Sequence, residues 1–352
     1  MRFATPIFVM GYMHSGTSLI KNILEKNAIV YDPGHEVQFF MHINSVCVKL
    51  NGRVKRCNVR EHVRNIIRDG FGKWNQKVVL ERIGNSCDKW DGSADEMIEL
   101  YLGEFSSLAR ENECEYFIDK SDAFIWYIES LLETLQNFKV LIILRDPRDV
   151  LASKKKRKLT TTIDRYQNKD LLARKKLEKK FSVFWDAISL RKYLKLLLKI
   201  QDNVKLKDKI VVVKYEDLVE APIETVRSIC SFIEIEFSEE MLNVTVANAS
   251  DNKVKRDRGI YKSIGNYNNV FSVSEKMFLE QCFKRILGEL GYESNWKTLY
   301  SLMRFPLFIW FGLRGLGEGV NYIYSRYKLL GRNVFKEWLL NHFKFFRSRG
   351  LR

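Results

Sequence analysis

The sequence lacks the patterns that would place it among disulfide-rich, zinc-binding or membrane-spanning proteins. Its six cysteines are scattered, with no C-x-x-C pair and no zinc-ligand spacing, so we expect buried free thiols in a reducing compartment and no metal site. No signal peptide is recognisable, because the apolar stretch PIFVMGY runs directly into a glycine loop. The apolar stretch LFIWFGL (307–313) stops at Arg314 and is too short to cross a bilayer. These absences predict a cytoplasmic protein.

The chain is rich in apolar residues and in positive charge. Its 352 residues are 46% hydrophobic and include 23 Phe, 15 Tyr and 7 Trp, which favours a folded globule over a disordered chain. The formal net charge of +16 favours anionic partners such as nucleotides, nucleic acid, acidic glycans or a membrane surface. A merely solvated basic face is the alternative that charge alone leaves open.

Short apolar segments alternate with stretches of helical periodicity. Segments rich in β-branched or aromatic residues predict buried parallel strands at 7–12, 115–119, 140–145 and 210–215. Helices are expected at 17–26, 121–135, 174–200, 222–234 and 274–290. This alternation predicts an α/β fold with a parallel sheet flanked by helices. We expect one domain over 1–298, with 41–110 inserted before the second predicted strand, and a basic, aromatic, helical C-terminal tail over 301–352.

The stretch GYMHSGTS is close to a phosphate-binding loop but lacks its lysine. Gly11, Gly16 and Ser18 fit the spacing G-x-x-x-x-G-K-[ST], whereas Thr17 stands at the lysine position. A strand, a glycine loop and a helix that begins near Thr17 direct unpaired backbone N–H groups at an anion, and Ser15 adds a hydroxyl. A triphosphate would lack its main counter-charge here, so a single 5′-phosphate fits the loop better.

A second candidate phosphate site follows the predicted strand at 140–145. Arg145 ends this strand, where α/β sheets bind ligands, and Ser153 returns a hydroxyl to the same place from the next helix. Pro147 suits the first position of that helix, with Asp146 as its cap. The alternative is a simple ion pair between Arg145 and Asp149 across the turn.

A third candidate is the stretch RDRGIYKSIGNYNN (256–269). A loop over a nucleotide needs glycine for close backbone approach and cations for charge, which Gly259 and Arg258 supply. Taken alone, the stretch is equally a basic surface loop.

The three stretches, in this order, resemble the sulfotransferases that use 3′-phosphoadenosine 5′-phosphosulfate (PAPS), and the glycan and tyrosylprotein branches in particular. In the 5′-phosphosulfate loop, usually [KR]-S-G-T-[ST], this chain has Ser15, Gly16, Thr17 and Ser18, with His14 in place of the basic residue. Arg145 and Ser153 match the 3′-phosphate motif, and Arg258 and Gly259 match the loop that closes over that phosphate. The resemblance implies a P-loop-like fold and metal-free transfer of a sulfuryl group from PAPS to an acceptor hydroxyl or amine.

In-line transfer needs a base for the acceptor proton and cations for the leaving phosphate. The resemblance implies a glutamate base after the first helix, where Glu36 stands. Asp122, after the strand at 115–119, is the alternative, although it could instead cap a helix. Lys120 and His14 are the candidate cations, and Lys21 is a third that could simply face solvent.

Two other functions are alternatives. A P-loop-type small-molecule kinase could use Asp119 as its magnesium ligand, but the absent lysine at position 17 counts against it. A non-enzymatic module that binds anionic lipid or nucleic acid would leave the glycine loop without a role. Because no RNA-recognition, zinc or helix-turn-helix signature is present, no nucleic acid partner is expected.

The acceptor is expected to be a carbohydrate or glycoconjugate. The insertion at 41–110 contains Trp74, Trp90 and several arginines, and aromatic faces stack on sugar rings while arginines hold acids. Ordinary core tryptophans are the alternative. The tail over 301–352 has ten Lys/Arg, two acidic residues and twelve aromatics. Such a segment could lie on an anionic membrane surface, or could dock on the domain or on a second copy in a homo-oligomer.

Overall fold

The computed structural model describes most of the predicted catalytic domain and the first part of the tail. The described residues are 4–32, 94–120, 125, 128, 135, 137–160, 181–244, 259–294 and 306–321 without 308. Most of the predicted helix at 121–135 and most of the insertion at 41–110 therefore lie outside them. The division into a domain over 1–298 and a separate tail stays a prediction.

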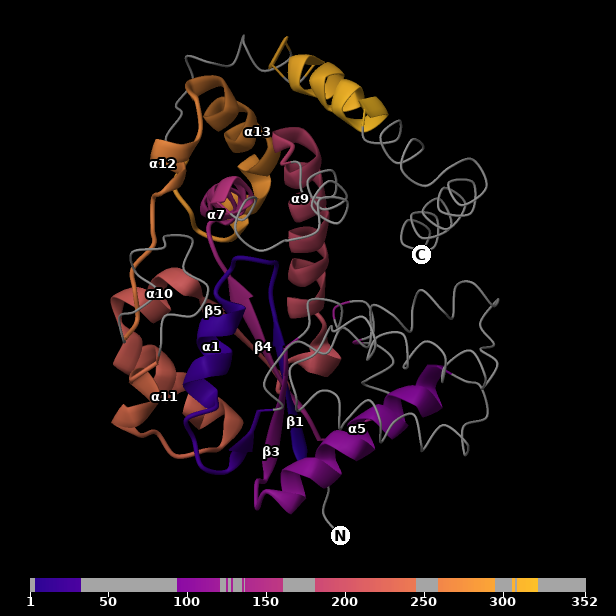
Figure 1. Ribbon diagram of the computed structural model, residues 1–352, viewed down its shortest axis with the longest axis vertical. Helices are drawn as coiled ribbons and strands as arrows, with labels where there is room; N and C mark the ends of the chain where they lie inside the picture. Colours follow the sequence, from indigo (N-terminus) through magenta and orange to yellow (C-terminus); the bar gives the residue numbers. More distant parts are fainter. Residues whose placement is uncertain are drawn as a thin grey trace, which may run out of the picture.

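A parallel sheet of five strands forms the centre of the molecule (Figure 1). The strands are β1 (Thr5–Met10), β2 (Val30–Tyr31), β3 (Tyr116–Lys120), β4 (Lys139–Leu144) and β5 (Ile210–Lys214), in the order β2-β3-β1-β4-β5. Strand β1 lies between β3 and β4, so the chain leaves it towards one edge and later returns to its other side. Such a switch point opens a crevice at the carboxyl ends of the strands, where ligands bind.

Helices cover both faces of the sheet, as predicted. One layer contains α1 (Thr17–Leu24), α10 (Tyr215–Glu220), α11 (Pro222–Ile233) and the short helix η4 (Glu239–Leu242). The other contains α5 (Ala94–Glu111), α7 (Pro147–Thr160), α9 (Val183–Gln201), η3 (Val204–Leu206), α12 (Tyr267–Val270) and α13 (Val273–Glu289). Successive β1 side chains pack into the two cores in alternation. Ile7 and Val9 pack towards α1 and α11, whereas Phe8 and Met10 pack towards α5 and α13.

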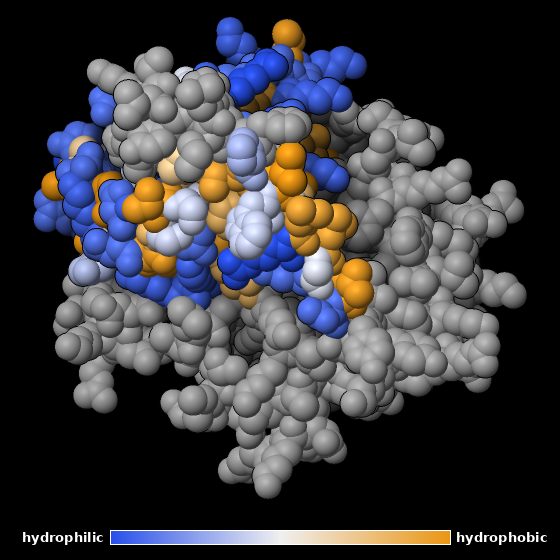
Figure 2. All heavy atoms as spheres, turned by 90° about the horizontal axis from the view of Figure 1, so that it is seen from above, coloured by the Kyte–Doolittle hydropathy of each residue, from blue (hydrophilic) through white to orange (hydrophobic). Residues whose placement is uncertain are grey.

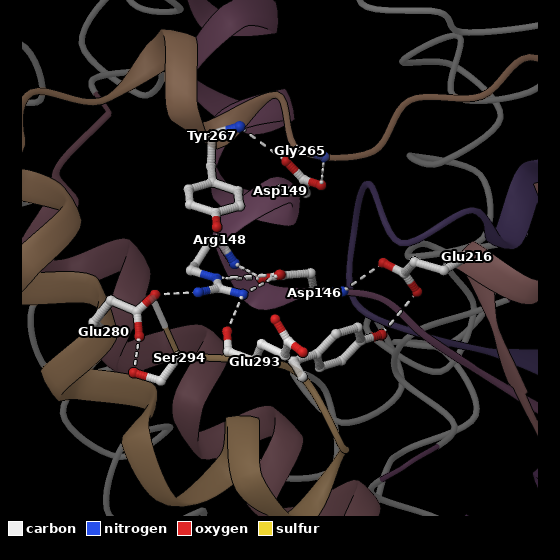
Figure 3. Close-up of polar contacts among 10 residues, drawn as sticks. Asp146, Arg148, Asp149, Glu216, Gly265, Tyr267, Glu280, Glu293 and Ser294 are labelled. Carbon is white, nitrogen blue, oxygen red and sulfur yellow. Dashed lines mark hydrogen bonds and ion pairs between the residues drawn. The ribbon is translucent and has the colours of Figure 1, made fainter. Parts of the chain in front are cut away.

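A buried ion-pair cluster joins the start of α7 to α13 (Figure 3). The Arg148 guanidinium binds the Asp146 carboxylate through Nε at 3.0 Å and Nη2 at 2.6 Å, and it also pairs with Glu280 of α13. Arg148 Nη2 donates to the Glu293 carbonyl at 3.0 Å, and the Ser294 hydroxyl donates to Glu280 at 2.7 Å. Each buried charge therefore has partners, which offset its loss of hydration. The cluster holds the turn after β4 in place.

Candidate active site

The glycine loop between β1 and α1 is tightly folded. A side chain at Gly11 would come within 2.6 Å of Ser15 Oγ and 2.9 Å of the Ile143 carbonyl. Gly16 and His14 have φ values of 105° and 74°, which lie in the left-handed region. The Ser15 hydroxyl donates to the Tyr12 carbonyl at 2.6 Å inside the turn. The loop thus presents the N-terminus of α1 to the carboxyl edge of the sheet, which is the geometry of an anion site.

Gly16 is expected to tolerate no side chain. Gly16→Ala combines a left-handed φ with a Cβ 2.6 Å from the Tyr215 ring, so we expect the free energy of unfolding to fall by about 1–3 kcal/mol. Gly288→Ala is the matched control, because nothing lies within 4 Å of a Cβ there, and helix α13 should gain roughly 0.5–1 kcal/mol. Denaturant titration measures both changes. Equal stability of the two variants would contradict the proposed constraint at Gly16.

Residues from two distant segments, β3 and α7, contact this loop and the start of α1. Lys120, at the end of β3, donates from Nζ to Ser18 Oγ at 2.9 Å. His14 Nδ1 lies 3.4 Å from the Ser153 hydroxyl of α7. The structure therefore brings together four residues that the sequence suggested for phosphate binding or charge stabilisation.

Arg145 joins the glycine loop to the segment that begins at Gly259. Its guanidinium donates from Nη1 to the His14 carbonyl at 2.9 Å, and Nη2 bonds to the Ser263 carbonyl and lies 3.3 Å from the Ser263 hydroxyl. The guanidinium carbon stands 4.3 Å from the centre of the Tyr215 ring, as in a cation–π contact. Within the described part of the chain, the buried Nε of Arg145 has no hydrogen-bond partner. A buried donor without a partner is costly unless a ligand satisfies it.

Asp149 of α7 anchors the loop that begins at Gly259, which we call the closing loop (Figure 3). Its carboxylate accepts hydrogen bonds from the backbone N–H groups of Gly265 at 2.7 Å and Tyr267 at 2.9 Å. Burial raises the pKa of Asp149, although these two N–H groups and the charge of Arg145 act in the opposite direction. The predicted alternative, a simple pair between Arg145 and Asp149, describes neither residue fully, because each binds the closing loop. Sequence reasoning missed this role of Asp149.

Further contacts hold the closing loop against α10 and against Val244. The Tyr215 hydroxyl donates to the Tyr261 carbonyl at 3.1 Å, and Lys262 pairs with Glu220 at 2.5 Å. Gly259 has a φ of 109° and donates its N–H to the Val244 carbonyl at 2.7 Å. Gly259 therefore lies in the same loop that Arg145 binds. Arg258, Glu36 and Asp122 lie outside the described residues.

A second polar cluster lies on the other side of the loop. Lys154 Nζ is 2.7 Å from Asp186 of α9 and 3.3 Å from the hydroxyl of Tyr12, which begins the turn after Gly11. Burial acts to lower the pKa of Lys154, but Tyr12 and Asp186 outweigh it and raise the pKa, so the ammonium stays charged. This cluster fixes Tyr12 between α7 and α9. No local pattern in the sequence predicts this cluster.

Lys21 is not the solvent-facing residue that the sequence allowed. It is buried on α1, where it bonds to Asp32 and lies 2.9 Å from Glu25. Its ammonium is thus paired with two carboxylates, of which Asp32 directly follows β2. In the described ranges, no group of three or more His, Cys, Asp or Glu side chains could hold a metal ion.

The model of the sulfotransferase family matches residues 6–239, well over half of the chain. The chain belongs to the sulfotransferase family. Two solved sulfotransferase domains share its fold at 16% identity. That of the olefin synthase of Synechococcus PCC 7002 has a TM-score of 0.53, over 84% of this chain and 97% of the domain. The sulfotransferase domain from the curacin biosynthetic pathway has a TM-score of 0.52, over 83% of this chain and 99% of that domain. No curated protein matches the sequence.

The parallel sheet and this membership confirm the predicted fold class and the predicted PAPS-dependent sulfuryl transfer, whereas the acceptor class stays a prediction. The sulfotransferase is an enzyme that takes its sulfuryl group from PAPS, and this assignment replaces the kinase and binding-module alternatives. The residues that hold PAPS and catalyse the transfer stay predictions, as does the branch of the family. The described residues of the site fit such a co-substrate, because a glycine loop, a strand-end arginine and a strand-end lysine converge there.

Lys120→Ala is expected to slow turnover by about 10- to 100-fold, because one charged donor to the leaving phosphate would be lost. Affinity for adenosine 3′,5′-bisphosphate should change much less. Lys139→Ala is the matched control. This lysine is the first residue of β4, so it lies at the amino ends of the parallel strands, and it pairs with Glu234 at 2.6 Å. Steady-state kinetics with saturating PAPS provide the measurement. Equal turnover of the two variants would remove Lys120 from the chemistry.

Proposed function

We propose that this sulfotransferase transfers a sulfuryl group from PAPS to an acceptor hydroxyl on a carbohydrate or glycoconjugate, by metal-free in-line displacement. The observation that carries the transfer step is the contact of Lys120 with Ser18 at the start of α1, which places a cation beside the candidate phosphosulfate loop. A cation at that point stabilises charge on the departing 5′-phosphate. The sugar acceptor is supported by the Trp and Arg residues of the insertion at 41–110.

The co-substrate would be held at both of its phosphate ends. We assign the 5′-phosphosulfate to the loop and the 3′-phosphate to residues at the end of β4 and in the closing loop; the residues are His14, Ser15, Gly16, Thr17, Ser18, Arg145, Ser153, Arg258 and Gly259. The unsatisfied Nε of Arg145 supports this assignment, because a phosphate oxygen would satisfy it.

We assign Glu36 as the base that takes the acceptor proton, with Asp122 as the alternative. We assign Lys120 and His14 as the groups that stabilise the charge of the leaving phosphate. Two arguments favour Glu36: it has no evident helix-capping role, and its place after the first helix matches the glycan-like branch. A cytoplasmic location and a homo-oligomer stay predictions.

Isothermal titration and an acceptor panel test the proposal. We expect adenosine 3′,5′-bisphosphate to bind equally well with and without a metal chelator. With labelled PAPS, transfer to glycans should exceed transfer to phenols, lipids and peptides. Binding that disappears with the chelator would overturn the metal-free step. Preferred labelling of a phenol or a peptide would overturn the proposed acceptor while leaving the use of PAPS intact.

A further inference from the structure

The helix at 306–321 packs on the catalytic domain through one face only. Phe311 is buried and stacks on Phe278 of α13, with ring centroids 4.7 Å apart. Gly315 lies so close to Phe184 of α9 that a Cβ there would be 2.6 Å from the ring. Trp185 donates its indole N–H to the Gly315 carbonyl at 2.7 Å. This face is therefore a docked surface, formed by small residues against aromatic rings.

The opposite face of the same helix is apolar and exposed. Ile309, Leu313, Leu316 and Val320 follow the spacing i, i+4, i+7 and i+11, which aligns them in one stripe, and Trp310 stands beside it. These five side chains are 45% to 65% exposed. We call them the apolar stripe. Figure 2 views this end of the molecule and shows apolar side chains at the surface where Figure 1 places the helix.

The apolar stripe places five exposed hydrophobic side chains on one helix. The other large hydrophobic residues that the described ranges expose are spread over separate elements, for example Val204 on η3, Ile223 on α11 and Val273 on α13. Five on one helix form a contiguous patch, which marks an interaction surface. No described helix is long and apolar enough to cross a membrane. The stripe therefore suits contact along a surface.

The charge of the adjoining sequence indicates the partner. Residues 322–352 contain eight Lys/Arg and one acidic residue, whereas on the helix itself Arg314 pairs with Glu318 at 3.1 Å. Cores of protein–protein interfaces are depleted in charge, whereas apolar and aromatic residues combined with many cations suit an anionic lipid surface. We propose that the apolar stripe binds the sulfotransferase to the surface of an anionic membrane, with the helix parallel to the bilayer.

This orientation bears on the reaction. In Figure 1 the helix lies beyond α9 and α13, at the end of the molecule towards which the strands lead. The carboxyl edge of the sheet, with Lys120 and Arg145, faces the same end. A membrane-bound enzyme would thus turn its catalytic edge towards acceptors carried by the lipid surface. The membrane contact itself does not depend on the proposed sugar acceptor.

Sedimentation with vesicles tests the proposal. The full chain is mixed with vesicles of phosphatidylcholine alone or with phosphatidylserine added, at about 50 mM and about 500 mM salt. We expect sedimentation with the anionic vesicles at low salt, and much less with neutral vesicles or at high salt. The double variant Leu313→Gln/Leu316→Gln should bind at least about tenfold more weakly, because polar side chains replace apolar ones without a change of charge. The double control Val204→Gln/Ile223→Gln should bind as the unmodified chain does.

Three outcomes would overturn the proposal. The full chain could stay in the supernatant with anionic vesicles at low salt, or the stripe variant could sediment as well as the control. The stripe variant could also turn a dimer into a monomer while vesicle binding is the same, which would make the stripe an interface between two copies. Binding of adenosine 3′,5′-bisphosphate, measured on each variant, reports folding and keeps this test separate from that of the proposed function.

Discussion

Replacing Arg145 with alanine is expected to weaken the binding of adenosine 3′,5′-bisphosphate by about 2–4 kcal/mol, or roughly 30- to 1000-fold. The guanidinium is buried, stacks on Tyr215 and carries an Nε without a partner in the described part of the chain. A phosphate there would receive charge-assisted hydrogen bonds in a site of low dielectric. Alanine can supply neither the charge nor the planar geometry.

The 3′-phosphate itself provides the sharpest control for this prediction. Adenosine 5′-phosphate lacks that group, so the unmodified chain should prefer the bisphosphate, and Arg145→Ala should lose most of the preference. Arg145 also links the His14 and Ser263 carbonyls, so part of the loss could arise from loop rearrangement, which weakens both nucleotides alike. Arg285→Ala, an exposed arginine on α13, serves as the matched substitution. An Arg145→Ala variant that retains the full preference would rule out contact with the 3′-phosphate.

Long apolar strands could be predicted from the sequence, whereas short elements could not. The four expected strands lie within two residues of β1, β3, β4 and β5, because a strand buried on both faces is a continuous apolar run. Strand β2 has only two residues and carries no period of its own. Helix α10 follows β5 directly at Tyr215, and no side-chain cap marks its start. Such boundaries are set by packing and not by local sequence.

The residues of the candidate site could likewise be predicted only where their signal is local in the sequence. Glycine spacing and a strand-end arginine are local signals, so the loop and Arg145 could be predicted. The role of Asp149 could not, because its partner Gly265 is 116 residues further along the chain. Lys154 resembles any other lysine in a basic helix until Asp186 and Tyr12 are seen around it. Residues that hold a site together through distant partners become visible only in the folded chain.

The choice of catalytic base rests on chemistry and on the reach of the chain. Strand β2 runs parallel to β3, with Tyr31 level with Phe117, and Asp32 is held by Lys21 of α1. Glu36 stands four positions after Asp32, and four residues span at most about 14 Å. Lys120 lies three residues beyond Phe117 on the neighbouring strand, so Glu36 is within chain reach of the edge where Lys120 and Ser18 meet. A carboxylate that reaches this edge can accept the proton of an acceptor hydroxyl.

Glu36→Gln is therefore expected to lower turnover by about a hundredfold or more while affinity for adenosine 3′,5′-bisphosphate stays unchanged. The amide keeps the size and the polarity of the side chain but cannot take a proton. Asp122→Asn is the matched variant, because it makes the same chemical change at the alternative base and should cost little turnover if Glu36 is correct. Single-turnover measurements with bound PAPS separate the chemical step from product release. If Asp122→Asn abolishes transfer and Glu36→Gln does not, the base is Asp122, two residues after Lys120 in the sequence.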